Sequence, residues 1–268
     1  MEILVSSQDR KLQRLLLLSQ KEQWHIDDLV WDSLSFDDMP IYFQRHLATV
    51  FSHLLYGEQV ALRCVKRLHD ELTNPVQQEL CKIQMKDERR HVAFFTTLLK
   101  NLHQPFELRD SLQKLLTDIY QAPTTETLLV GIHIVIENIA HTLFQSAQDV
   151  IQNTKVSQPN ASIKSLQRIT TNWIPNYLLI DESRHLAIGH ILLQERLSKI
   201  SPVQKAQLET VITRWGNLLF DMVIDPDMLR NIGLNEPKHA IQCLKDVNLR
   251  LRQLDIDVQL PIPPSISI

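Results

Sequence analysis

The chain has 268 residues, of which 44% are hydrophobic and 22% charged, and it contains only 5 glycines. So few turn-forming residues argue against an all-β fold and predict a mainly helical globule with a sizeable core. A formal net charge of -3 and a pI near 6.4 give no broad attraction for phosphate backbones or anionic lipid, so nucleic acid and membrane surfaces are not expected partners. The expected ligand is a small molecule or another protein.

Three cysteines stand far apart in the sequence, at Cys64, Cys81 and Cys243, and indicate neither a disulfide framework nor a thiolate metal site. The N-terminus lacks the basic-then-apolar order of a secretion signal, and no apolar run is expected to span a bilayer. We therefore expect a cytoplasmic protein.

Prolines and short polar clusters divide the chain into stretches with helical periodicity. A connector over residues 24–40 is expected to be irregular, and a proline-rich tail after Asp255 is expected to lie extended on the surface. No linker divides the chain, so we expect one domain over residues 1–268, with a core bundle over about 41–199. The expected helices cover residues 8–22, 41–72, 76–102, 107–120, 125–153, 161–198, 202–224 and 236–254.

Four of these helices are long, and each carries an acidic side chain within its apolar stripe. The first and third of the four carry a single glutamate on the apolar face, whereas the second and fourth carry a Glu-x-x-His motif. In chain order the set is Glu58, Glu88 with His91, Glu137, and Glu182 with His185.

Four ionised carboxylates buried together would cost many kcal/mol through desolvation and repulsion unless cations neutralised them. Residues i and i+3 of a helix lie side by side, so each Glu-x-x-His motif can offer one oxygen and one nitrogen to the same ion. The two single glutamates can then complete or bridge the coordination of two ions. Oxygen-rich ligation with one imidazole per ion suits iron or manganese. The pattern predicts two iron ions, with a manganese–iron pair as the alternative.

The order Glu, Glu-x-x-His, Glu, Glu-x-x-His resembles the ligand set of the ferritin-like di-iron carboxylate proteins of the ribonucleotide reductase small-subunit superfamily. The stretches "YGEQVAL" around Glu58 and "LIDESRHLAIG" around Glu182 are the most family-like. The motifs are also similar to those of the di-iron N-oxygenases that act on arylamines. The resemblance implies a ferritin-like four-helix bundle and a homodimer. With the helices expected before residue 41 and after residue 199, the expected fold is all-α, a four-helix bundle with additional N- and C-terminal helices.

Each Glu-x-x-His motif follows an aspartate and carries an arginine directly before its histidine. Metal-bound histidines usually donate their second ring N–H to a carboxylate, and two antiparallel helices would exchange these aspartates. The alternative is that both aspartates are exposed residues of the adjoining helix face. The expected pairs are Asp87 with His185, Asp181 with His91, and Arg90 and Arg184 with these aspartates or with a helix end.

Several positions bear on how far the resemblance extends. His141 shares the helix face of Glu137 and is a candidate extra nitrogen ligand, with a hydrogen-bonded core histidine as the alternative. The arylamine N-oxygenases carry an extra histidine where this chain has Leu178, which argues against that specific assignment. Phe95 stands where the reductase small subunit carries its radical tyrosine, and Ile132 stands where related lipid-binding oxidases carry a crosslinked tyrosine. Neither a stable tyrosyl radical nor that crosslink is expected at these places.

A substrate pocket is expected beside the second Glu-x-x-His motif, because Gly189 follows His185 by one turn and leaves space there. Tight helix packing at Gly189 is the alternative. Pro175 should kink its helix two turns before Glu182. The expected lining residues are Ala61, Leu62, Phe95, Phe144 and Gly189.

These residues predict an O₂-activating di-iron oxygenase or oxidase that N-oxygenates or hydroxylates a small organic or carrier-tethered substrate, with an electron donor as partner. One alternative is a radical-storing or electron-transfer subunit of the reductase small-subunit type, with Trp31 and Asp32 as a relay. A second alternative is a ferritin-like iron-binding protein without catalysis.

Overall fold

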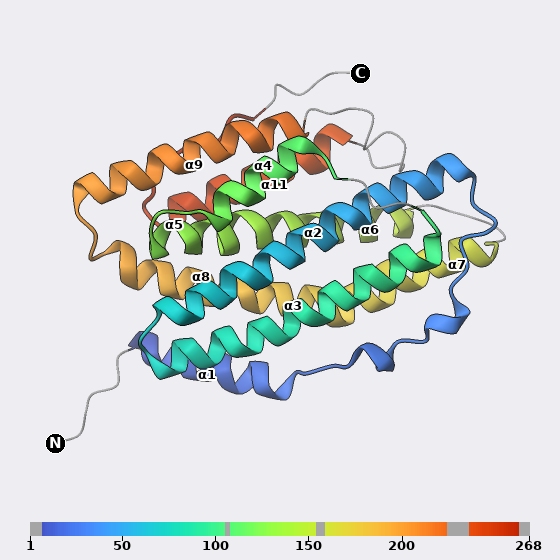
Figure 1. Cartoon of the computed structure of the whole chain (residues 1–268), viewed down its shortest axis with the longest axis horizontal. Coiled ribbons are helices and arrows are strands. Elements are labelled where there is room, and N and C mark those ends of the chain that lie inside the picture. The colour runs from blue at the N-terminus through green and yellow to red at the C-terminus, as the bar shows by residue number, and fades with distance from the viewer. Residues whose placement is uncertain (1–6, 105–107, 154–158, 224–235, 263–268) are drawn as a thin grey trace.

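The computed structural model describes residues 7–104, 108–153, 159–223 and 236–262. Within these residues the regular elements are all helices, as the composition predicted. Four long rods form the centre of the molecule (Figure 1). They are α2 (Ile41–Glu71), α3 (Pro75–Leu102), the run of α5 (Thr125–Leu129), η3 (Val130–Ile136) and α6 (Glu137–Asn153), and the run of α7 (Ala161–Arg168), η4 (Ile169–Leu178) and α8 (Leu179–Leu197).

Helices α2 and α3 form an antiparallel hairpin and lie side by side along most of their length (Figure 1). Asn74 caps α3 by accepting hydrogen bonds from the backbone N–H groups of Val76 and Gln77, and Pro75 supplies the first helical residue. The apolar stripes of both helices face the centre of the bundle, where their residues are buried.

The other two rods each contain a π-helical segment, which the apolar periodicity did not predict. Segment η4 contains Pro175, whose missing N–H breaks the α-helical hydrogen-bond ladder, so the predicted kink takes the form of a π-helical stretch. Segment η3 ends directly before Glu137. Widened turns of this kind shift the register of the side chains that follow, and they are frequent at functional sites.

Further helices cover the rods on two sides (Figure 1), which confirms the prediction of additional N- and C-terminal helices. At the N-terminal side α1 packs against α3 and α8, and two short 3₁₀ turns follow it. On the opposite side α4 and α9 pack together and α11 lies along α6. The bounds are α1 (Ser7–Lys21), η1 (Ile26–Asp28), η2 (Trp31–Ser33), α4 (Asp110–Tyr120), α9 (Pro202–Val223) and α11 (Glu236–Gln253).

The C-terminal tail corrects one expectation. Residues after Asp255 are extended, as predicted, but the side chains of Ile256 and Leu260 are buried rather than on the surface. The backbone of Leu260 exchanges two hydrogen bonds with the Asn248 side chain, at 2.7 and 3.1 Å. Gly216 permits this contact, because a Cβ there would lie 2.5 Å from Leu260 Cδ2. The last predicted tail residues, 263–268, lie outside the described residues.

One helical stretch, Thr125–Gln145, is long and apolar enough to cross a bilayer, contrary to the expectation that no run would be. Its most apolar window is 83% buried inside the protein. A helix that is apolar on all sides is typical of the centre of a bundle, and this stretch is such a core helix.

Candidate metal centre

The structure brings together all six side chains of the Glu, Glu-x-x-His, Glu, Glu-x-x-His pattern, and we call them the cluster. Each rod contributes to it, and each of the six is at most 3% exposed. Two groups of three have potential ligand atoms that all lie within 4.8 Å of one another. The groups are Glu58, Glu88 and His91, and Glu88, Glu137 and His185.

Glu88 and Glu182 lie between two halves of the cluster. Nδ1 of His91 is 3.6 Å from Glu88 Oε2 and 3.2 Å from Glu182 Oε1. Nδ1 of His185 is 3.5 Å from Glu88 Oε1 and 3.8 Å from Glu182 Oε2. Glu58 stands 3.5 Å from His91, and Glu137 stands 3.5 Å from His185. The arrangement is thus two halves, each with one glutamate and one histidine, bridged by two further carboxylates.

Many polar atoms of the cluster have no hydrogen-bond partner, although no solvent reaches them. The 3.2 Å approach between His91 and Glu182 lacks hydrogen-bond geometry. A buried polar atom without a partner costs about 1–3 kcal/mol. So many of these atoms in one place indicate electron-pair donors that bind a cation in the functional protein. Oxygen donors with one imidazole nitrogen per half fit iron or manganese. The atoms concerned are Glu58 Oε1, Glu88 Oε2, both carboxylate oxygens of Glu182, and Nδ1 of His91 and His185.

Burial and crowding change the proton affinities of the cluster. Burial, followed by the charge of Glu137, raises the pKa of Glu88 to about 8, and the same two causes raise the pKa of Glu182 well above its usual range. Burial alone would lower the pKa values of His91 and His185, but the surrounding carboxylates outweigh it and raise both. The metal-free cluster therefore holds protons at neutral pH.

Metal uptake should release these protons, because a metal ion needs deprotonated ligands. The apparent affinity for Mn²⁺ or Fe²⁺ should rise as the pH passes through the Glu88 pKa of about 8, because this carboxylate then no longer carries a competing proton. Calorimetric titrations in two buffers with different heats of ionisation measure the protons released per ion. Heats that do not depend on the buffer would contradict the prediction.

Each aspartate of the repeated motif reaches the histidine with which the sequence analysis paired it. Asp181 Oδ2 lies 3.2 Å from His91 Nε2, and Asp87 Oδ2 lies 3.2 Å from His185 Nε2. Both aspartates are at most 1% exposed, so the reading as surface residues is wrong. Because a carboxylate accepts, each Nε2 carries a proton, and each Nδ1 faces the cluster and would bind an ion once it has lost its own proton.

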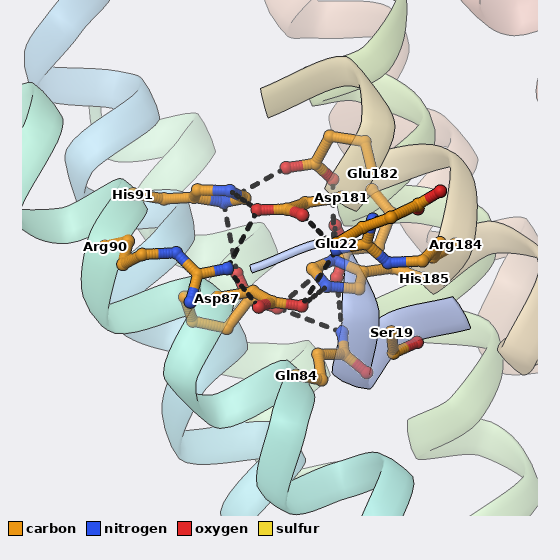
Figure 2. Close-up of polar contacts among 12 residues, drawn as sticks. Ser19, Glu22, Gln84, Asp87, Arg90, His91, Asp181, Glu182, Arg184 and His185 are labelled. Atoms are coloured by element: carbon orange, nitrogen blue, oxygen red, sulfur yellow. Dashed lines mark hydrogen bonds and ion pairs between the residues drawn. The ribbon is translucent and has the colours of Figure 1, made fainter. Parts of the chain in front are cut away.

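The two motif arginines close this network on its outer side (Figure 2). Arg90 contacts Asp87 and lies 3.3 Å from Asp181, and Arg184 contacts Asp181 and lies 3.7 Å from Asp87. Glu22, directly after the end of α1, pairs with Arg184 at 3.0 Å. Burial would raise the pKa of Asp181, but His91 and Arg184 lower it well below its usual range.

Trp24 belongs to the same network, although the sequence analysis did not select it. Its Nε1 donates to Asp181 Oδ2 at 2.8 Å, and its ring stacks near His91 with centroids 6.4 Å apart. Trp31, which the sequence analysis named with Asp32 as a relay, donates to the Ile26 carbonyl, and that relay stays a prediction. Trp24 lies in the irregular connector, where no periodicity indicates which side chain turns inward.

Gln84 and His133 also adjoin the cluster. Gln84 Nε2 donates to Glu88 Oε1 and to Glu137 Oε1, both at 2.9 Å, and His133 Nε2 lies 3.1 Å from Gln84 Oε1. Both side chains are buried. Their sequence signal was their place on the apolar faces, one turn before Glu88 and one turn before Glu137.

His141 does not join the cluster. Four residues advance an α-helix about 40° past a full turn, and this rotation brings His141 to an outer groove that is also lined by Lys11, His190 and Arg250. Burial and the charge of Arg250 lower the pKa of His141. The histidine is thus neither a buried filler nor a neighbour of Glu137's carboxylate.

In the part of the chain that the structure describes, the predicted pocket residues pack against other side chains. A Cβ on Gly189 would lie 2.1 Å from the Cβ of His133, so His133 fills the space that was expected there, and tight helix packing explains the glycine. Phe95 and Phe144 are buried and stack with centroids 6.0 Å apart. Ala61 is buried in a different apolar group, and Leu62 is only partly buried.

No protein-family model matches the chain, and no curated protein matches it. Solved structures do. A candidate class I ribonucleotide reductase from Bacillus halodurans superposes with a TM-score of 0.71 at 17% identity, covering 95% of each chain. The chain has a ferritin-like fold. A second ferritin-like structure, protein 19 with aldehyde deformylating oxidase activity from Synechococcus, gives a TM-score of 0.56 at 16% identity, covering 80% of this chain and 95% of that one.

At these identities the similarity concerns the fold alone. The fold and the cluster agree independently, however, since the cluster lies in the middle of the ferritin-like bundle and unites side chains from all four of its rods. The protein is thus a ferritin-like helical bundle with a carboxylate–histidine cluster of the di-iron type.

Proposed function

We propose that the protein is an O₂-activating di-iron oxidoreductase, either an oxygenase or an oxidase, with a manganese–iron pair as the alternative cofactor. The observation that carries this proposal is the buried set of carboxylate oxygens and imidazole nitrogens without hydrogen-bond partners. Glu58 and His91 would hold one ion, and Glu137 and His185 would hold the other. Glu88 and Glu182 would bridge the two ions.

A reduced di-iron pair supplies two electrons to O₂. The chain's own residues provide the surroundings for this chemistry. Asp87 and Asp181 keep the proton of each histidine on Nε2 and so present Nδ1 to the ions. Large buried side chains such as Phe95 and Phe144 exclude water from one side. Trp24 links the connector to His91 through Asp181, which supports a route for electrons from a donor protein.

The oxidase activity of the Synechococcus protein agrees with an oxidoreductase but does not identify a substrate here. The described side chains around the cluster do not favour N-oxygenation over hydroxylation. Storage of a tyrosyl radical at the position of Phe95 is disfavoured, because a phenyl ring has no O–H to lose. A small-molecule substrate, an electron donor and a second copy of the chain remain the expected partners.

Anaerobic titration with Fe²⁺, followed by mixing with O₂, tests the proposal. We expect two ions per chain and rapid consumption of O₂ with an optical change that metal-free protein does not give. A Glu137→Ala variant is the control and should lose at least one ion. Wild-type protein that binds fewer than two ions, or that binds two and does not react with O₂, would overturn the proposal.

A further inference from the structure

The two halves of the cluster differ in the residues one helical turn away, although the Asp-Glu-x-Arg-His motif is repeated. Beside Glu137 and His185 these neighbouring residues are two polar side chains and a glycine, which has no side chain. Beside Glu58 and His91 all three are apolar. All of them are buried. The corresponding pairs are Gln84 and Leu178 before the motif glutamates, His133 and Leu54 before the single glutamates, and Gly189 and Phe95 after the histidines.

Gln84 connects two carboxylates through one amide group. Its Nε2 has two hydrogens and lies 2.9 Å from an oxygen of Glu88 and 2.9 Å from an oxygen of Glu137. The reverse orientation would set the amide oxygen against both carboxylates, so chemistry selects the amide nitrogen at this place. Gln84 is 2% exposed, and water does not compete for these hydrogen bonds.

His133 holds the other end of the amide. Burial lowers the pKa of His133 to about 4, so the ring is neutral and its Nε2–H donates to Gln84 Oε1 at 3.1 Å. The His133 ring packs directly against the backbone of α8 at Gly189, and this contact fixes the position of the ring. A Cβ on residue 189 would lie 2.1 Å from the Cβ of His133. Segment η3, which carries His133, thus packs closely enough to reach Gln84.

The hydrogen bonds divide the carboxylate oxygens unequally. Gln84 occupies Oε1 of Glu88 and Oε1 of Glu137, whereas Glu58 Oε1 and both oxygens of Glu182 have no donor. Glu88 and Glu137, each 3.5 Å from His185 Nδ1, are therefore held in place before any ion arrives. Glu58 and Glu182 have buried leucines, Leu54 and Leu178, one turn before them in place of such an amide, so no equivalent hydrogen bond holds Glu58 Oε1 or either oxygen of Glu182.

We propose that Gln84, held by His133, is a positioning residue that makes the two metal positions unequal, so that the position beside His185 is filled before the position beside His91. This inference rests on the proposed di-iron function and adds an order of loading to it. Prearranged ligands bind more tightly, because binding does not have to order them.

Anaerobic titration with Mn²⁺, followed by electron paramagnetic resonance and calorimetry, tests the proposal. At one ion per chain, wild-type protein should give the spectrum of an isolated ion, and the coupled pair should appear only with the second ion. Gln84→Met keeps the length of the side chain but removes the amide. We expect it to weaken the tighter step by roughly ten- to a hundredfold, the range for lost outer partners of metal ligands, and to give coupled pairs at low loading.

Leu178→Met is the matched control, because Leu178 occupies the equivalent place before Glu182 and should leave both steps unchanged. His133→Leu should act in the same direction as Gln84→Met, and the double variant should be no weaker than Gln84→Met alone, since both act through one contact. If Gln84→Met does not fold, His133→Leu alone decides the matter.

Two unchanged steps in the variant that folds would overturn this inference and leave the proposed function intact. Wild-type protein that binds no ion would end both proposals.

Discussion

Glu182→Gln is expected to have opposite effects on the metal-free and the metal-loaded protein. Glu182 is fully buried, both of its oxygens lack a hydrogen-bond partner, and it lies between the two histidines. In the metal-free protein a negative charge on Glu182 would destabilise the fold, and burial and then the charge of Glu137 accordingly raise its pKa. In the metal-loaded protein the same charge would neutralise the ions.

The sign of the pH dependence follows from this raised pKa. The folded protein keeps a proton on Glu182 that the unfolded chain releases above a pKa near 4.3, so this residue's contribution to stability is complete below that pH and is lost as the pH rises through the folded pKa. Glutamine has no such proton to lose. The metal-free variant should therefore be at least as stable as the wild type at pH 6 and more stable, by about 1–3 kcal/mol, at pH 8.

Metal-induced stabilisation should change in the other direction. An ion that binds only the folded state raises the unfolding temperature by an amount that grows with the logarithm of its affinity, and the neutral amide should remove most of that rise. Thermal unfolding with a chelator and with Mn²⁺, at pH 6 and at pH 8, measures both effects. Glu195→Gln, on the same helix but partly exposed and paired with Lys199, is the control and should alter neither. A Glu182→Gln protein that retains the full metal-induced rise contradicts the role of this carboxylate.

The six cluster residues could be predicted from the sequence because a helix converts spacing directly into direction. Glu58 occupies a place in its apolar stripe where a leucine belongs, and the structure buries it. The exchange of Asp87 and Asp181 between the motifs could also be predicted, since it needs only two antiparallel helices that face each other. These inferences use regular geometry, which local sequence specifies.

The remaining features depend on departures from that geometry. Segment η3 has an apolar pattern that an α-helix would also satisfy, so the sequence does not reveal the wider turn that packs His133 against Gly189. The sequence analysis interpreted Gly189 as leaving room for a substrate, but His133 of η3 occupies that room. Trp24 is buried although it belongs to a connector without periodicity. Leu260 is buried although it belongs to a tail whose composition is typical of a surface segment. Tertiary packing decides each of these cases.

Asp181→Asn is expected to lower both the stability and the metal affinity of the protein. Asp181 is fully buried and accepts hydrogen bonds from Trp24 at 2.8 Å and from His91 at 3.2 Å, and it also contacts Arg184 and Arg90. Removing its charge leaves cations without their counter-ion in the interior, which typically costs about 3–5 kcal/mol. Chemical unfolding of the metal-free variant at pH 7 measures this loss.

The difference between the variant and the wild type should shrink in acid. Because the pKa of Asp181 is depressed in the folded protein, its contribution is present above the ordinary pKa of about 3.9 and disappears as the pH falls toward the folded value. The weaker hold on His91 should reduce metal affinity roughly ten- to a hundredfold.

Trp24→Phe separates the charge of Asp181 from its hydrogen bonds. This variant removes one neutral donor and keeps the carboxylate, so it should cost about 1 kcal/mol and leave metal affinity within a few fold of the wild type. If Asp181→Asn does no more harm than Trp24→Phe, the carboxylate acts only as a hydrogen-bond acceptor, and its negative charge does not balance the arginines or orient the histidine.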